Sequence, residues 1–314
     1  MSIKDPKILL LYILLLLMVI IWSFSFIIVD IALDFTTPLS IALYRYIIAS
    51  ISFIIINIYV KLNQKSIQDK LKNNVKNKFT RNEWILIVIA SFTGVSLFFF
   101  AQYSAINLIG PSLPALFVCL LAPVIISFLA LLFFNEKLSK IKIIGFVIAS
   151  IGAFFLITGG NIETLTPQSP NFLGFLLAIF TPVLWALYST STKQITKEKS
   201  SLKMLEYICY LGTIELFIFV IIYGEFFVFI SNLTNIIVLL CCLYLGLGSF
   251  ILGTYIWQNS QKNLKSSKVA SFLYIEPFIT LFFAFLLQRS GIIFLWNIIG
   301  GVIVLIAVII INHE

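Results

Sequence analysis

Few ionisable residues lie inside the apolar segments of this chain, and Glu276 has the most unusual setting among them. It directly precedes Pro277 in the segment FLYIEPFIT at 272–280. A carboxylate costs roughly 2.5–3.5 kcal/mol at the centre of a membrane helix, so it should face water, a cation or a proton. A proline there bends the helix and frees a backbone carbonyl, which is tolerated beside a cavity. Glu276 and Pro277 are therefore candidates for a substrate or proton site. The alternative is a neutral acid packed against a neighbouring helix.

Arg45 and Glu215 are two further candidates in apolar surroundings. The planar donor fork of Arg45 could bind the carboxylate of a substrate. The same side chain could equally extend outward to the membrane surface or pair with Asp30 or Asp34, and both interpretations stay open. Glu215 lies near the middle of its segment and is a second candidate for carrying protons.

The composition indicates a multi-pass protein of the cell membrane. Of the 314 residues, 61% are hydrophobic and 11% are charged, and the mean hydropathy is +1.08. A soluble globule of this size could not bury that much apolar side chain. The four cysteines lie in apolar segments without CxxC spacing, and the single histidine, His313, is next to the end of the sequence. We therefore expect no cofactor, metal or disulfide, and assign the cysteines to packing.

Hydrophobic stretches of roughly 18–25 residues predict an all-α integral membrane protein with ten transmembrane helices. The predicted ranges are 8–29, 38–60, 84–107, 111–134, 142–159, 172–190, 204–228, 235–258, 268–287 and 292–311. The first is longer than the apolar region of a signal peptide, roughly 7–15 residues, and has no small-x-small cleavage site. We interpret it as a retained helix.

The basic residues predict the orientation of these helices. Apart from Arg45 and Arg289, every Lys and Arg falls in the N-terminal segment or in alternate loops. Because basic loops stay in the cytoplasm, both termini are predicted to be cytoplasmic. The net charge of +8 then reflects this bias and requires no nucleic acid partner. The expected partners are the lipid bilayer and a small-molecule substrate.

The two halves of the chain share an order of features. In each half a proline lies deep in one span and a glycine lies in the middle of the next, as Pro123 and Gly145 and as Pro277 and Gly300. This order predicts two repeats of five helices. Pro123 therefore joins the candidate site residues as the counterpart of Pro277.

The predicted repeats cover residues 1–160 and 161–314. Five spans is an odd number, so the second repeat must cross the membrane in the opposite sense to the first. Such inverted repeats place a central site between them and favour alternating access to the two sides.

Several segments together resemble the EamA-type branch of the drug/metabolite transporter superfamily. They are WSFSF at 22–26, the arginine of ALYRY at 42–46, LLAPV followed by LLFFNEKLSKIKIIGFVIASIGAFFLI, and ASFLYIEPF in the second half. The resemblance implies a ten-helix inverted-repeat carrier of small metabolites, commonly an exporter of amino acids or related compounds. Glu136 in the NEKL turn looks like the acidic residue that follows the fourth span in this family, whereas the second half has QRSG at 288–291.

Aromatic and amide residues on the first, third, sixth and eighth spans are candidates for the cavity wall, because these helices line a cavity in the family that the chain resembles. The candidates are Trp22, Tyr103, Asn107, Trp185, Tyr188, Tyr255 and Trp257. Aromatic faces with polar tips suit amphipathic solutes or cationic groups. Ordinary packing, or a position in the interfacial belt, is the alternative for each.

A stripe of small residues, Gly145, Ala149 and Ala153, recurs every four positions along the fifth predicted span. It predicts a close helix contact, either within the protein or in a homodimer. The segment GLGSFILG at 246–253 lies within a span and has no strand before it, so it does not indicate a nucleotide site.

These observations predict a secondary transporter, an exporter of small metabolites such as amino acids or amphipathic compounds, in which an acid couples movement to protons. The chain has no phosphate loop. An integral membrane enzyme and a passive channel are the rival interpretations. The enzyme is disfavoured because no metal-ligand cluster and no nucleophile beside a base is evident.

Overall fold

The computed structural model describes residues 6–62, 78–135, 139–158, 160, 171–289 and 295–312, and all regular structure in these ranges is helical. The elements in chain order are α1 (Pro6–Leu33), α2 (Pro38–Leu62), α4 (Arg81–Ser91), η1 (Phe92–Ser96), α5 (Leu97–Ile109), α6 (Ser112–Phe134), α7 (Lys140–Thr158), α8 (Phe172–Thr196), α9 (Ser201–Ile222), α10 (Phe226–Asn232), α11 (Ile236–Leu243), η3 (Tyr244–Thr254), α12 (Tyr255–Asn263), α13 (Ser266–Ser271), η4 (Phe272–Ile275), α14 (Glu276–Leu286) and α15 (Leu295–Asn312).

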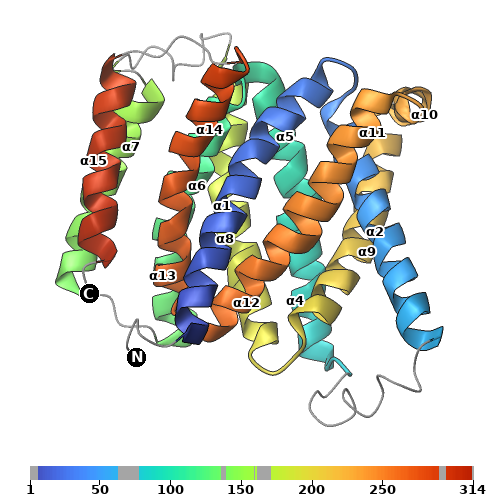
Figure 1. Ribbon diagram of the computed structural model, residues 1–314, viewed down its shortest axis with the longest axis horizontal. Coiled ribbons are helices and arrows are strands. Elements are labelled where there is room, and N and C mark those ends of the chain that lie inside the picture. Colours follow the sequence, from blue (N-terminus) through green and yellow to red (C-terminus); the bar gives the residue numbers. More distant parts are fainter. Residues whose placement is uncertain are drawn as a thin grey trace.

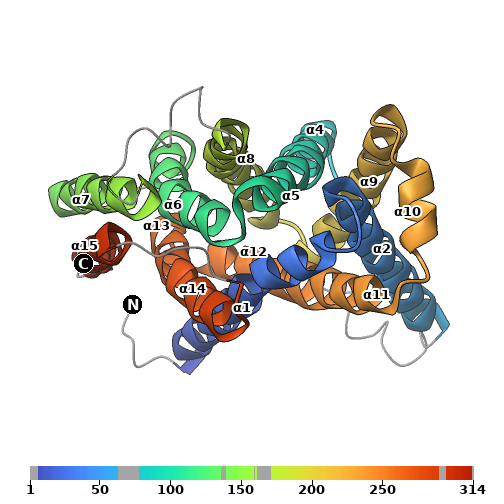
Figure 2. The same ribbon diagram turned by 90° about the horizontal axis from the view of Figure 1, so that it is seen from above.

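In the described ranges, eight helical rods are long and apolar enough to cross a membrane. Three of them are composite: α4–η1–α5, α11–η3–α12 and α13–η4–α14. Two further apolar helices, α7 and α15, pack along each other at one end of the molecule (Figures 1 and 2). The structure thus confirms an all-helical protein with several candidate spans, while the count of ten stays a prediction.

The seventh predicted span, 204–228, is too long by several residues. Helix α9 ends at Ile222, and Gly224 has a φ of +70°, which glycine adopts without the steric cost that a side chain would add. The chain then turns into the short helix α10 (Figure 1).

The composite rods contain irregular turns where the sequence weakens the α-helix. Segments η1 and η3 are π-helical, and η3 contains all three glycines of GLGSFILG. Pro277 has no N–H to donate to the preceding turn, and that turn, η4, has 3₁₀ geometry. Irregular backbone before Pro277 therefore agrees with the sequence interpretation, whereas α6 continues through Pro123.

Helix α1 shows why the molecule needs an apolar surrounding. Its buried residues and its exposed residues are both apolar: Leu15, Met18 and Val19 are fully buried, whereas Ile13 and Ile20 are about half exposed. A helix in water would carry polar residues on its exposed face. Seen from above, α1 passes through the middle of the molecule, where it contacts α14, η3 and α5 (Figure 2).

The predicted small-residue stripe packs within the protein. Gly145 and Ala149 are buried, and Ala149 belongs to one core cluster with Val304 and Ala307 of α15. A Cβ on Gly152 would lie 2.9 Å from the carbonyl oxygen of Gly300, so the two backbones approach closely there. Contact with α15 accounts for the stripe as far as Ala149, and the side chain of Ala153 lies outside the described residues.

Candidate functional site

A central cavity contains about 640 Å³ of space, its open mouth included. It is bordered by residues of α1, α2, η1, α5, α6, α8, η3, η4 and α14, so segments far apart in sequence meet there. The polar or charged members of its wall are Ser25, Arg45, Tyr46, Gln102, Tyr103, Cys119, Tyr188, Ser249, Thr254 and Glu276. Most of the remaining wall is apolar or aromatic, which is typical of a site for a small organic solute.

Arg45 lies at one part of this wall and is only 2% exposed. Its Nη1 donates a hydrogen bond to the Tyr103 hydroxyl, and its Cζ lies 4.4 Å from the ring centroid of Phe99 and 5.5 Å from that of Tyr46. Its Nε has no hydrogen-bond partner within the described part of the chain. A buried guanidinium held by aromatic groups and not by an acid has donors available for an anionic group.

Pairing of Arg45 with Asp30 or Asp34, one of the open interpretations, is wrong. Arg289 takes both aspartates: its Nη1 lies 3.2 Å from Asp30 Oδ2 and its Nη2 lies 2.5 Å from Asp34 Oδ2. Arg289 lies just after α14, so this ion pair joins the end of α14 to the end of α1. Extension of Arg45 to the membrane surface is wrong too, because its side chain is buried.

Glu276 lies at another part of the same wall and is 3% exposed. Its backbone carbonyl accepts hydrogen bonds from Ser23 Oγ (3.1 Å) and Thr280 Oγ1 (3.0 Å). Its carboxyl group is hydrogen-bonded by the Cys119 thiol, and it forms no ion pair with any described residue. The cavity thus holds one buried cation and one buried acid that do not neutralise each other.

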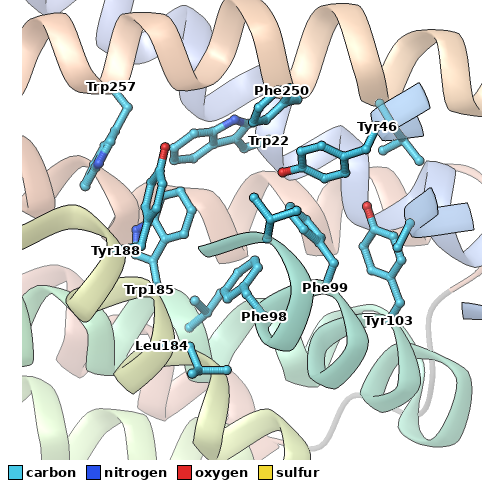
Figure 3. Close-up of a cluster of buried hydrophobic side chains, with 14 of the residues drawn as sticks. Trp22, Tyr46, Phe98, Phe99, Tyr103, Leu184, Trp185, Tyr188, Phe250 and Trp257 are labelled. Atoms are coloured by element: carbon cyan, nitrogen blue, oxygen red, sulfur yellow. The ribbon is translucent and has the colours of Figure 1, made fainter. Parts of the chain in front are cut away.

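Aromatic side chains form the wall around these groups (Figure 3). Trp22 meets Trp185 edge to face with ring centroids 5.2 Å apart, and Trp185 lies 5.0 Å from Tyr188. Trp22 Nε1 donates to the carbonyl oxygen of Ser249 at 2.9 Å, which fixes the indole against the π-helical segment η3. Trp257 is fully buried behind Trp22 and Trp185, with centroids 5.7 and 5.8 Å away.

Six of the predicted site residues therefore border one cavity: Trp22, Arg45, Tyr103, Trp185, Tyr188 and Glu276. Pro277 is buried directly after Glu276, and Pro123 is buried within α6 without bordering the cavity. Asn107 and Tyr255 are exposed, so neither is placed in the wall.

Glu215 lies outside the cavity, between α9 and the α4–η1 rod. Its Oε1 accepts a hydrogen bond from Ser91 Oγ at 2.7 Å, and its Oε2 accepts one from Ser96 Oγ. These two hydroxyl groups satisfy the carboxyl group locally. Glu136 lies outside the described residues.

Helix α5 supplies wall residues that sequence inspection missed. Phe98, Phe99, Gln102 and Ile106 border the cavity together with Tyr103. Their spacing of three and four places them on one face of a helix. Gln102 could have indicated this face of α5 from the sequence, because an amide in an apolar helix beside a candidate tyrosine needs a partner or water.

Helices that enclose a charged cavity and expose apolar side chains around their outside are typical of membrane transporters. This chain belongs to the EamA-like transporter family, which it matches over residues 9–158 and 172–313. The family predicted from the sequence is confirmed.

Relatives in three organisms are named transporters as well. The uncharacterized transporter YyaM of Bacillus subtilis (strain 168) is 26% identical over 274 residues, covering 87% of this chain and 84% of that protein. An uncharacterized transporter of Archaeoglobus fulgidus is 24% identical over 298 residues, or 95% of both chains. One of Clostridium kluyveri is 23% identical over 239 residues, covering 76% of this chain and 75% of that protein. These names point to a transporter and not to an enzyme.

A solved crystal structure has the same fold. It superimposes with a TM-score of 0.70 and 15% identity, covering 96% of each chain. At this identity the likeness concerns the fold alone.

Proposed function

We propose that this protein is a secondary transporter that carries small zwitterionic metabolites, such as amino acids, across the cell membrane by alternating access. Outward transport is part of the proposal, following the family resemblance. The observation that carries the substrate class is the presence of Arg45 and Glu276 in one cavity without an ion pair between them. A solute with both a carboxylate and an ammonium group would complement both side chains.

The Arg45 end suits a carboxylate. A guanidinium offers parallel N–H donors that fit two carboxylate oxygens, and the unpartnered Nε supplies one of them. The hydrogen bond to Tyr103 and the Phe99 ring hold the group in place, so little side-chain entropy is lost when the solute binds.

The Glu276 end suits an ammonium group, and the same acid is our candidate for proton coupling. When no solute is bound, a carboxyl group in an apolar wall is stabilised by a proton. An arriving ammonium group would favour release of that proton. Solute and proton would then compete for Glu276, which is the simplest form of exchange between them.

The architecture of the proposal is two inverted five-helix repeats with ten spans. The family matches two stretches of similar length, 9–158 and 172–313, and α7 and α15 supply the two helices beyond the eight candidate spans. In Figure 1, α1 begins and α15 ends on the same side of the molecule, which agrees with an even number of crossings. We assign this side to the cytoplasm from the basic loops.

Counterflow into liposomes tests the proposal. The purified protein would be reconstituted with an unlabelled neutral amino acid inside, and uptake of three labelled compounds compared: the amino acid, its deaminated carboxylic acid and its decarboxylated amine. We expect exchange of the amino acid and at least about tenfold weaker exchange of the other two, because each loses one charge-assisted hydrogen bond. Imposing a pH gradient then tests coupling.

The matched control is Arg289→Gln, which removes an arginine that lies outside the cavity. It should keep the ranking of the three compounds, whereas Arg45→Gln should abolish the advantage of the carboxylate. Equal exchange of all three compounds by the unmodified protein would overturn the assignment of a zwitterion. Movement without saturation or counterflow would indicate a channel.

A further inference from the structure

Polar side chains are buried between α8, α12 and α13, on the side of the cavity toward which α8 ends. We call this group the polar seam and define it as Ser189 and Lys193 of α8, Gln258 and Gln261 of α12, and Ser266 of α13. All five are buried. The spacings of four on α8 and three on α12 place the residues of each helix on one face.

The polar seam lies on the opposite side of the cavity from the end of α5. Gly174, in the first turn of α8, packs against Leu108 and Ile109 at the end of α5. The cavity residue Ile106 lies near that same end. Helix α8 runs from there past Tyr188 in the cavity wall to the polar seam, so the seam continues from the cavity toward the other face of the membrane.

Three hydrogen bonds close the contact between α8 and its neighbours along this course. Gln258 Nε2 donates to the Tyr188 hydroxyl at 2.7 Å, at the cavity wall. Lys193 Nζ donates to Ser266 Oγ at 2.5 Å, one turn further along α8. Lys262 Nζ donates to the Lys199 carbonyl oxygen at 3.4 Å, past the end of α8.

Other polar atoms of the same contact have no hydrogen-bond partner within the described part of the chain. They are Ser189 Oγ, Gln258 Oε1 and both amide atoms of Gln261. Burying polar groups without partners is costly, and most buried polar atoms in folded proteins are paired. A permanent helix contact would be more stable with apolar side chains here. The cost is understandable if this contact separates and water reaches these groups in a second conformation.

We propose that the polar seam is the second half of the solute pathway, closed in this conformation, and that the Tyr188–Gln258 hydrogen bond holds it shut. This inference rests on the proposed function. Tyr188 borders the cavity and lies against Trp185, so a solute that displaces the Tyr188 ring would also disturb its bond to Gln258. The amide and hydroxyl groups of the opened seam would then replace water around a small zwitterion.

Cysteine accessibility tests this assignment, with and without the neutral amino acid of the counterflow assay as the solute. In a background with Cys119, Cys209, Cys241 and Cys242 replaced by alanine, single cysteines would be introduced as Gln261→Cys in the seam and Gln102→Cys in the cavity. The matched control is Ile195→Cys, a position of α8 that is as buried as the seam but apolar. A charged, membrane-impermeant methanethiosulfonate reagent would be added to each face of sealed vesicles.

We expect the cysteine at 261 to react only from the face at which α8 ends, and faster than the cysteine at 195. Gln258→Met removes the hydrogen bond and keeps a side chain of similar size, and Tyr188→Phe removes the same bond from the other side. Each should raise the rate at 261 by about 2- to 10-fold and lower the rate at 102, because it shifts the balance between the two conformations. The double variant should give the same shift as either single variant.

A higher rate at 261 together with a lower rate at 102 distinguishes this proposal from a merely structural role of the hydrogen bond. Loosened packing would raise the rates at 102, 195 and 261 together. Rates at 261 that match those at 195 in every variant, while the rate at 102 still responds to solute, would overturn the seam and leave the transporter intact. No response to solute at either position would instead count against the proposed function.

Should the cysteine-free background fail to fold, hydrogen exchange of the protein with its own cysteines, compared with and without Gln258→Met, offers a second test. Gln258→Met should increase exchange in peptides from α12 and α13 and decrease it in peptides from α5. An increase in all three, or no change in any, would contradict the proposal.

Discussion

Arg45 and Glu276 border one cavity, yet within the described part of the chain no ion pair joins them. Opposite charges buried close together would normally pair, because an unpaired charge in an apolar region is costly. Here Arg45 is held by Tyr103 and aromatic rings, and Glu276 by the Cys119 thiol. The two groups are thereby kept available for a ligand.

Replacement of Arg45 should separate charge from geometry. Arg45→Gln removes the charge and should weaken binding of a carboxylate solute by about 10- to 100-fold, the range for loss of a hydrogen bond to a charged group. Arg45→Lys keeps the charge but loses the parallel donors, so we expect an intermediate loss. Solute-dependent protection against thermal unfolding in detergent measures both. Equal affinity of Arg45→Lys and unmodified protein would show that the donor fork is not used.

Glu276→Gln should change the preference between solutes more than the total rate. It removes the partner of the ammonium group, so the advantage of an amino acid over its deaminated acid should shrink by about tenfold. Glu215→Gln is the comparison, because that carboxyl group is held by Ser91 and Ser96 outside the cavity. We expect Glu215→Gln to leave the preference unchanged in competition assays. A similar loss of preference in both variants would remove Glu276 from the binding site.

Gly94→Ala should damage the cavity wall. A Cβ on Gly94, within η1, would overlap the ring of Tyr188. Because that ring is buried among other aromatic groups, relief by movement is limited, and we expect about 1–3 kcal/mol of destabilisation with reduced transport. Gly248→Ala is the control, since its Cβ would meet nothing closer than 3.8 Å. Thermal unfolding of the two variants in detergent decides; equal midpoints would contradict the close packing of Gly94 on Tyr188.

Arg289→Gln should have a small effect that depends on salt. The hydrogen bond with Asp34 raises the pKa of Arg289, so the guanidinium stays charged throughout the usable pH range. The Arg289 and Asp34 side chains are 31% and 49% exposed, so the pair contributes up to about 1 kcal/mol and is screened by ions. The difference in unfolding midpoint between the variant and the unmodified protein should be smaller at high salt than at low salt. A large effect that persists at high salt would contradict this.

Hydropathy predicted the all-helical membrane fold, and half of the residues that the sequence singled out as site candidates border the cavity. Trp22, Arg45 and Glu276 stand out in sequence because an apolar segment rarely contains such side chains, and all three border the cavity. Asn107 does not border the cavity, because it lies two residues from the end of α5, where an amide can reach polar surroundings. Its residue type made it a candidate, but the sequence did not show how close it lies to the end of its helix.

The π-helical segments explain other differences. Ser249 and Thr254 both border the cavity although they are five residues apart, which an α-helix would place on different faces. In η3 the hydrogen bonds reach five residues back, so such residues come close to one another. Tyr255, the next residue, is exposed. A regular α-helical periodicity would not have predicted Ser249 and Thr254 on the same face.

The segment η1 has a consequence for how this protein can change over evolutionary time. A π turn holds about one residue more than the α-helical turn it replaces. Five residues of a π turn cover about the same angle as four residues of an α-helix. Deleting one residue between Phe92 and Ser96 would therefore turn η1 into a regular helix and leave Gln102 and Tyr103 facing the cavity. A one-residue gap in an alignment at this place is compatible with the same cavity wall, whereas the same gap within α5 would rotate the residues beyond it by about 100°.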